Sequence, residues 1–376
     1  MIIIGKNMDP IRSLIHCFAL AAVLLSSSVS AQADVDRLNT PALPSYRADQ
    51  TLMLDIAKHG DQLLAVGDQG VVMRSSDQGQ HWQQVQTPFS VMLTSVFFTD
   101  AQHAWLTGHD GLFAASQDGG MTWQKLLDGD QINRLRLQRL QAIAAELQSQ
   151  LDAEPDNESL MMRSDDATWY AEDAAAAVEE GPSIPLLDVW FADQQRGFAL
   201  GAYGLLLKTD DGGQSWAYWG DRLDNPDNFH LNAMMADHRG DLYIAGEAGL
   251  LFRSTDKGMH WIRIDTPYEG SFFSITEFKQ QLFLMGLRGH LYRSDDGIDW
   301  QAVKTGYQAT LLSAVAEADK LVLLGQGGLI IESADGQHFT PLDSGGRRSL
   351  SAGVAVDGGY RLVGEGGLLS LEAGDE

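Results

Sequence analysis

The sequence contains a single cysteine, few basic residues and only one long apolar run, and each of these shortages limits what the protein can be. Cys17 lies inside that run, near the start of the chain. If the run is removed during export, the remaining chain has no thiol, which excludes disulfides, thiolate metal sites and a cysteine nucleophile. A chain without cysteine also suits an oxidising compartment.

The apolar run predicts an export signal. Lys6 and Arg12 precede it, it extends over residues 14–25, and small residues ending in Ala33 follow. This order is typical of a secretory signal peptide, which we predict to span residues 1–33 and to be cleaved near Ala33. The alternative is a membrane anchor, but the run is shorter than the roughly 20 residues that a spanning helix needs. We therefore expect a periplasmic protein.

Basic residues are about half as common as acidic ones. The chain has 26 Lys and Arg against 51 Asp and Glu, a formal net charge of −25. Such a surface repels nucleic-acid phosphates and anionic lipid headgroups. Nucleic acid is therefore excluded as a partner, and we expect any association with a membrane to be peripheral rather than membrane-spanning.

Glycine, in contrast, is abundant, with 39 residues, and it marks an internal repeat. The pattern is Gly-x-x-Gly, an apolar stretch, and a polar loop that ends in an aromatic residue. The first glycines of successive copies are about 40 residues apart, with one interval of 93. They are Gly67, Gly108, Gly201, Gly246, Gly286, Gly325 and, in an incomplete last copy, Gly364. Two apolar stretches precede each pair, so each repeat holds four short strands, as a propeller blade does.

This period predicts an all-β fold, a seven-bladed β-propeller formed by a single domain over residues 34–376. The glycines are expected to supply the positive φ of tight hairpin turns. The seventh copy contains only three strands. We expect residues 34–48 to form an N-terminal strand that adds the fourth, because closing the ring in this way removes an exposed sheet edge.

The polar loops share a pattern in which Ser or Thr is followed two residues later by Asp, and then by Gly and an aromatic residue. Such side chains suit a tight loop, since Ser and Asp bond backbone amides and the aromatic ring fills the space between blades. We assign a structural role to the six aspartates, which are Asp77, Asp118, Asp211, Asp256, Asp296 and Asp335.

These loops resemble the Asp-box, or BNR, repeat. Combined with the Gly-x-x-Gly turns and the shorter boxes of later copies, they make the chain from about residue 50 onward resemble the BNR propellers of the photosystem II stability and assembly factor family. The resemblance implies an exported, non-enzymatic factor that helps to assemble or stabilise a membrane protein complex. Related proteins in non-photosynthetic bacteria are associated with membrane transporters, so photosynthesis is not implied. We expect a monomer without cofactors, whose partner is a membrane protein complex or transporter.

The family carries arginines in the repeat, and four cations of this chain share one position, four residues after the second glycine. They are Arg74, Lys208, Arg253 and Arg293. The resemblance implies a basic arc that binds the partner. The arc is interrupted, because Ala115, Glu332 and Leu371 occupy this position in the other copies. The alternative is that each cation pairs with a nearby Asp-box carboxylate or stacks on a tryptophan.

The long interval contains an insertion over about residues 128–182. Isoleucine and leucine at helical spacing, without Gly or Pro, predict a helix over 131–152, and the acidic, alanine-rich stretch 165–180 predicts a second. The insertion should leave the ring on the face of the Gly-x-x-Gly turns. Two interpretations stay open, a helical hairpin that buries its leucines on the blades, or an arm that binds a partner and caps the central channel.

Asp-boxes also occur in sialidases, so a glycan-binding or glycan-hydrolysing propeller is the alternative function. A sialidase-like site needs an arginine triad, a tyrosine with a glutamate and an acid donor, a set that the sequence does not supply. A carboxylate pair could still come from Asp55 and Asp188 with Glu247 or Glu365. The ten histidines are scattered, so we predict no metal site and no catalytic residues.

Overall fold

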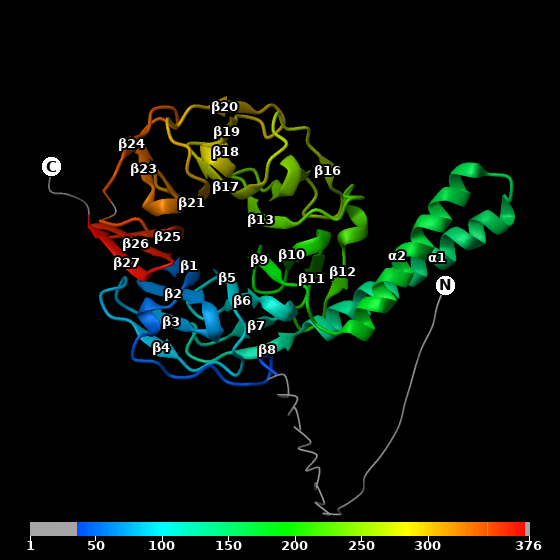
Figure 1. Ribbon diagram of the computed structural model, residues 1–376, viewed down its shortest axis with the longest axis horizontal. Coiled ribbons are helices and arrows are strands. Elements are labelled where there is room, and N and C mark those ends of the chain that lie inside the picture. The colour runs from blue at the N-terminus through cyan, green and yellow to red at the C-terminus, as the bar shows by residue number, and fades with distance from the viewer. Residues whose placement is uncertain (1–35, 344, 373–376) are drawn as a thin grey trace, which may run out of the picture. The chain divides into compact units, whose positions relative to one another are not determined.

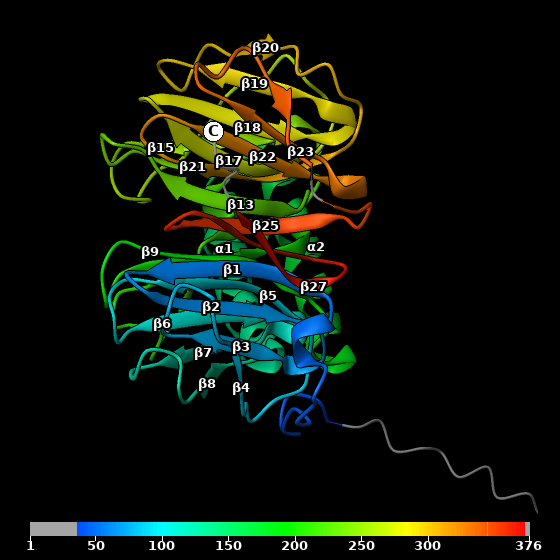
Figure 2. The same cartoon turned by 90° about the vertical axis from the view of Figure 1, so that its left-hand side faces the viewer.

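The structure, a computed structural model, describes residues 36–343 and 345–372. The predicted signal peptide, residues 1–33, lies outside this part of the chain. Within it, seven antiparallel sheets surround a central opening, as Figure 1 shows. In each sheet the strands follow one another from the centre outward, and Figure 2 shows the same sheets from the side. The all-β class predicted from the repeat is confirmed.

The strands of the first four sheets have the following bounds. Sheet 1 contains β1 (Met53–His59), β2 (Gln62–Gly67), β3 (Val72–Ser75) and β4 (Gln83–Val85). Sheet 2 contains β5 (Leu93–Phe98), β6 (Ala104–Gly108), β7 (Phe113–Ser116) and β8 (Gln124–Leu127). Sheet 3 contains β9 (Leu186–Phe191), β10 (Gly197–Gly201), β11 (Leu206–Thr209) and β12 (Ala217–Tyr218). Sheet 4 contains β13 (Leu231–Ala236), β14 (Leu242–Gly246), β15 (Leu251–Ser254) and β16 (Ile262–Arg263).

The other three sheets continue the same order. Sheet 5 contains β17 (Phe272–Phe278), β18 (Gln281–Gly286), β19 (Leu291–Ser294) and β20 (Gln301–Val303). Sheet 6 contains β21 (Leu311–Ala316), β22 (Leu321–Gly325), β23 (Ile330–Ser333) and β24 (Thr340–Pro341). Sheet 7 has three strands, β25 (Leu350–Val356), β26 (Gly359–Gly364) and β27 (Gly367–Glu372). The ring closes where β1 packs against β25.

The hydrophobic core consists of layers between neighbouring sheets. The second strands β10 and β14 are buried along their whole length, since a sheet lies against each of their faces. Strands covered on both faces read as continuous apolar runs rather than alternating ones. The aromatic residue of each polar loop joins such a layer. Trp216 of sheet 3 packs edge-on against Phe113 of sheet 2, with ring centroids 4.7 Å apart.

The first glycine of each pair does not supply the positive φ that we expected. Gly67 has an extended backbone, with φ −172°. A Cβ built there would lie 2.0 Å from the carbonyl oxygen of Leu52, so the incoming chain excludes any side chain. The positive φ values fall instead on Gln69 (55°) and Gly70 (71°), which form the tight turn itself.

The predicted N-terminal strand is also wrong for the described residues. Sheet 7 has three strands, and residues 36–47 contain no strand. They run beside sheet 1, where the amide of Ala42 donates to the carbonyl of Thr87 (3.2 Å). Only a short turn, η1 (Ala48–Gln50), packs against β27. Pro41 and Pro44 explain the difference, because proline has no amide to donate to a strand ladder.

Two antiparallel helices, α1 (Gly129–Ala153) and α2 (Glu158–Glu180), connect β8 to β9. A capping box starts α1, since Asp128 accepts from the amide of Gln131 (3.2 Å) and the Gln131 side chain accepts from the amide of Asp128 (3.0 Å). The helices extend outward from the ring beside β12 and do not cover its opening, so the cap over the channel, part of one of the two interpretations, is wrong (Figure 1). No helix in the described ranges has the length and apolarity needed to span a bilayer.

The layers between sheets predict the cost of adding one methyl group. Gly258 (φ 81°) and Gly240 (φ 85°) both have left-handed backbones, but a Cβ on Gly258 would lie 2.3 Å from Phe198 Cζ, whereas one on Gly240 meets nothing within 4 Å. In both alanine variants the left-handed backbone lowers the free energy of unfolding by about 1 kcal/mol. We expect overpacking against Phe198 to lower it by roughly a further 1–3 kcal/mol in Gly258→Ala. Urea unfolding of both variants measures this difference, and equal losses would contradict it.

Candidate functional site

Each Asp-box aspartate accepts hydrogen bonds inside its own loop. Ser75 Oγ donates to Asp77 Oδ1 (2.7 Å), and the amide of His81 donates to the same oxygen (2.9 Å). The equivalent hydroxyl bonds of the other five loops measure 2.8 to 3.0 Å. The amide and side chain of His260 lower the pKa of Asp256 to about 2. These carboxylates lie in six separate sheets and do not converge on one site.

The four predicted partner-binding cations occupy the same position of their third strands, and two of the arginines contact the next sheet. Arg74 Nε donates to the carbonyl of Gly119 (2.8 Å) in the Asp-box loop of sheet 2. Arg253 donates to Asp241 (2.6 Å) and to the carbonyl of Asp296 (3.1 Å) in the loop of sheet 5. Both side chains therefore join neighbouring sheets.

The other two cations differ from each other. Lys208 forms an ion pair with Asp210 and lies 5.4 Å from the ring centre of Trp219. The Arg293 side chain has no ion pair or hydrogen bond with any other residue in the described ranges. In sheet 7 the equivalent residue is Ser370, not Leu371, because the hairpin between β26 and β27 lacks the extra turn residue and shifts the pairing by one.

Two carboxylates and one hydroxyl meet at the inner strands. Ser95 Oγ lies 3.1 Å from Asp55 Oδ2 and 2.8 Å from Asp188 Oδ1. A hydroxyl has one proton to donate, so both contacts are favourable only when one carboxyl is protonated. Burial raises the pKa of both groups, and the neighbouring Asp55 helps to raise the pKa of Asp188 to about 7.

These carboxylates connect the inner strands of different sheets. Asp55 Oδ2 accepts from the amide of Val96 in sheet 2, and Asp188 Oδ2 accepts from the amide of Met234 in sheet 4, both at 2.8 Å. The two glutamates considered for glycan chemistry lie elsewhere. Glu247 accepts from the amide of His230 (2.9 Å) and Glu365 from the amide of Ser349 (3.0 Å). Across the described ranges, no three His, Cys, Asp or Glu side chains are grouped to hold a metal ion.

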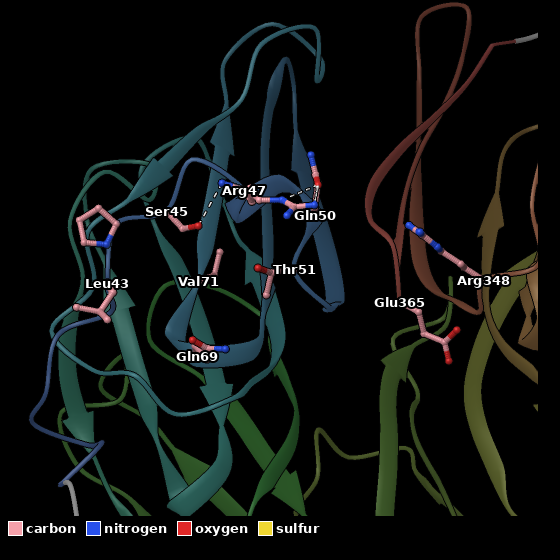
Figure 3. A pocket seen from close by; sticks show the side chains of 10 residues that line it. Leu43, Ser45, Arg47, Gln50, Thr51, Gln69, Val71, Arg348 and Glu365 are labelled. Carbon is pink, nitrogen blue, oxygen red and sulfur yellow. Dashed lines mark hydrogen bonds between the residues drawn. The ribbon is translucent and has the colours of Figure 1, made fainter.

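A recess of about 780 Å³ lies between sheets 7 and 1 (Figure 3). Sequence reasoning missed it, because it joins segments from opposite ends of the chain. Arg47 lies on one side and is held by Gln50 Oε1 (3.1 Å), while Arg348 and Glu365 lie on the other. In the part of the chain that the structure describes, the Arg348 guanidinium has no hydrogen-bond partner. The lining is completed by Leu43, Pro44, Ser45, Thr51, Gln69 and Val71.

A second recess, of about 600 Å³, runs along β27 and is here called the edge recess. It shares Ser45 with the first. Sheet 1 contributes the Asp-box segment from Gly79 to Trp82, sheet 7 contributes Arg361 and residues 368–370, and the N-terminal segment contributes Tyr46, Ala48 and Asp49. The edge recess therefore lies where the fourth strand of sheet 7 would be.

The helix pair forms a third concave surface with sheet 3. A groove of about 370 Å³ is lined by leucines of α1 and by Tyr170 and Tyr218. Arg139 pairs with Asp221 (2.6 Å), which fixes α1 to the loop after β12. On α2, Met162 is 64% exposed and Trp169 is 58% exposed. The helices thus bury some of their leucines, as the interpretation of a packed helical hairpin required. They also expose apolar side chains, as the interpretation of a partner-binding arm required.

A ring of short antiparallel sheets, six of which have an Asp-box loop between their third and fourth strands, defines a β-propeller of the BNR class. The sequence model of the family described as photosynthesis system II assembly factor YCF48 matches residues 74–150 and 162–348. These segments cover more than half of the chain, which therefore belongs to this family.

Individual relatives agree with the family match. The photosystem II assembly lipoprotein Ycf48 of Synechococcus sp. (strain CC9902) is 43% identical over 94 residues, which are 24% of this chain and 27% of that relative. The chain thus spans about a quarter of the curated relative it matches. Two solved structures share the fold at 14% identity and TM-score 0.60. One is YCF48 bound to D1 peptide, covering 89% of this chain and all of that chain, and the other is YCF48 from Cyanidioschyzon merolae, covering 88% and 97%.

The pairing of the cations predicts unequal effects of the same substitution. Arg253→Met removes the bonds to Asp241 and Asp296 and leaves the Asp241 carboxylate without its partner, so we expect a loss of about 1–3 kcal/mol of unfolding free energy. Arg293→Met, at the same repeat position, is expected to change it by less than about 0.5 kcal/mol. Chemical denaturation of the two variants measures this, and an equal loss would show that the Arg253 bonds contribute little.

The Asp55–Ser95–Asp188 group predicts a pH dependence of stability. The pKa of Asp188 in the folded protein, about 7, is above its ordinary value of 3.8. Its protonation therefore favours the folded state below about pH 4, and this contribution is lost as the pH rises through 7. Asp188→Asn cannot titrate, so the stability of the wild type relative to this variant should fall between pH 4 and 8, by on the order of 1–3 kcal/mol. Urea titrations at several pH values test this; a constant difference would contradict the raised pKa.

Proposed function

We propose that this chain is an exported, non-enzymatic propeller that acts as an assembly or stability factor for a membrane protein complex. The match to the assembly-factor family across both segments is the observation that carries this proposal. We describe the ring as seven-bladed, with α1 and α2 as an insertion between the second and third blades. The solved relative bound to D1 peptide supports a client that is a segment of a membrane protein.

Export to the periplasm is part of the proposal. It is supported by the predicted signal peptide, residues 1–33, and by the description of the Synechococcus relative as a lipoprotein. The acidic surface and the surface recesses are consistent with a peripheral monomer that contacts its client through protein rather than lipid. A membrane protein complex or transporter is the proposed partner class.

The contacts of the candidate residues favour this function over glycan hydrolysis. Asp55 and Asp188 bond amides of neighbouring sheets, and the Asp-box carboxylates bond their own loops. Arg74, Lys208 and Arg253 likewise bond groups of this chain. We propose that Arg74 and Arg253 join blades, that Lys208 pairs within its own blade, and that the client docks on the recesses beside sheet 7 and on the helix pair.

The helix pair provides a direct test of the proposed function. A Cβ on Gly129 would lie 2.7 Å from Pro182 Cβ, so the two ends of the insertion adjoin and a short linker can replace residues 131–180. We expect crosslinking and affinity recovery of the tagged protein from native envelope membranes to yield a specific membrane protein. Deletion of the helix pair should reduce that yield.

Two controls make the result decisive. The deletion variant must keep the circular dichroism and unfolding midpoint of a folded ring, since otherwise a lower yield reflects unfolding. A variant with Trp169→Ala and Met162→Ala tests the exposed side chains alone. Failure of the intact protein to recover any membrane protein would overturn the proposed function, while equal yields with and without the helices would place docking on the ring.

A further inference from the structure

Sheet 7 is the only sheet in the described ranges that lacks a fourth strand. The outer strands of the other six sheets are two to four residues long. Beside β27, no main-chain hydrogen bond from residues 36–52 or from any other described segment reaches the outer edge. An unpaired edge of this kind is a template for an additional strand.

The pairing of β26 with β27 shows which groups face outward. The two strands join through a two-residue turn, Glu365–Gly366, closed by the pair Gly364 and Gly367. In a two-residue hairpin the closing pair is hydrogen-bonded, and the bonding alternates along the ladder. Leu369 therefore faces β26, whereas the amides and carbonyls of Leu368 and Ser370 point away from the sheet.

Apolar surface is also uncovered at this edge. In four Asp-boxes the tryptophan is buried, but Trp82 of sheet 1, which lines the edge recess, is only half-buried. Leu368 packs into the same layer as Trp82. A fourth strand on sheet 7 would extend this layer and cover the tryptophan.

Arg361 gives the edge recess a chemical preference. Of the side chains that contact the Asp-box glycine of the next sheet, four are aromatic, namely Phe113, Phe198, Tyr243 and Phe283. At sheet 7 this residue is Arg361, which packs on Gly79 and is 8% exposed. Its Nη1 donates to Glu372 (3.1 Å) and to the carbonyl of Tyr360 (3.2 Å), but its buried Nε has no partner among the described residues. A buried guanidinium N–H without an acceptor favours a carboxylate.

We infer that β27 binds an extended, acidic segment of the client polypeptide as the fourth strand of sheet 7. This inference rests on the proposed function and names the site and the chemistry of the client. Opposed residues share a face, so a side chain opposite Ser370 lies on the face of Arg361. An acidic residue at that position reaches the guanidinium, and apolar residues two positions away cover Trp82.

The client segment, rather than another part of this chain, fits the edge best. Residues 36–47 are bound beside sheet 1 and contain Pro41 and Pro44. The outer strands elsewhere show that two to four residues complete a sheet, so a short segment suffices. The chain's net charge of −25 repels acidic segments from most of its surface, so arginines must recruit one, and the edge recess combines an arginine with an unpaired strand edge.

The test uses a defined probe, the acetylated and amidated peptide Leu-Thr-Glu-Thr-Leu carrying a fluorophore. We expect saturable binding in the millimolar range and slower hydrogen exchange at Leu368 and Ser370. Ser370→Pro removes an outward amide at an edge position that tolerates proline, so it should weaken binding about ten-fold, whereas Ser370→Ala should not. The peptide N-methylated at glutamate keeps its side chains but cannot pair, and should not bind.

Arg361 is tested by the identity of the central residue. The glutamate peptide should bind the wild type more tightly than its glutamine version, and Arg361→Gln should abolish this preference. If Arg361→Gln does not fold, the salt dependence of the wild type with the two peptides provides the same comparison, since only the charged pair is screened.

Three results overturn the inference. One is the absence of exchange protection on β27 at millimolar peptide. Another is equal binding by the Ser370→Pro and Ser370→Ala variants. The third is a dimer in sedimentation that Ser370→Pro dissociates, which would make a second copy the occupant.

If Ser370→Pro recovers as much membrane client as Ser370→Ala, the edge inference fails and the proposed function stands. If the wild type recovers none, the proposed function fails and the peptide experiment still decides the edge.

Discussion

Burial of both faces of every sheet is the constraint on which this fold depends. A single four-stranded sheet cannot bury its apolar second strand, as β10 and β14 require, so each sheet must lie between two others. The Asp-box loops serve this packing, because they position a tryptophan in the layer between sheets and keep a glycine where the neighbouring side chain needs space. Gly258 beside Phe198 shows how little room remains. The carboxylates of these loops therefore have a structural role, because they hold the loops in the conformation that this packing needs.

The same constraint explains why the acidic residues of the inner strands bond amides. Asp55 and Asp188 join strands that no backbone ladder connects, since neighbouring sheets pack face to face. Arg74 and Arg253 do so further from the centre, through carbonyls of the next loop. The polar groups that suggest a glycosidase in the sequence are thus used to hold sheets together. In the proposed function, a client is recognised where this packing is incomplete, at the helix pair and at sheet 7.

Much of the fold could be predicted, because a repeat of about 40 residues specifies strands, turns and packing at once. Both helices were predicted, and the start of α1 was predicted to within a few residues, since leucine spacing and the capping residues agree there. The course of the N-terminal segment was predicted wrongly, because the expectation of a strand rested on the strand missing from the last repeat and left Pro41 and Pro44 out of account. Of the candidate site, the Asp-box residues and four cations were found by their period. The recesses beside sheet 7 were not, because Arg47 and Arg348 are outside the repeated motifs and the segments that line the recesses meet only through ring closure.

That closure has a consequence for how the molecule forms. The first and last sheets are joined by contacts such as Lys58 Nζ to the carbonyl of Ala355 and Gln78 to Asp357, and no described strand from one end of the chain pairs with a strand from the other. Such contacts close the longest loop in the ring and carry the largest entropic cost, so they are the last that folding can reward. The seam between sheets 7 and 1 is also the joint at which no chain segment leads from one sheet to the next, so under mechanical load only non-covalent contacts hold the two sheets together.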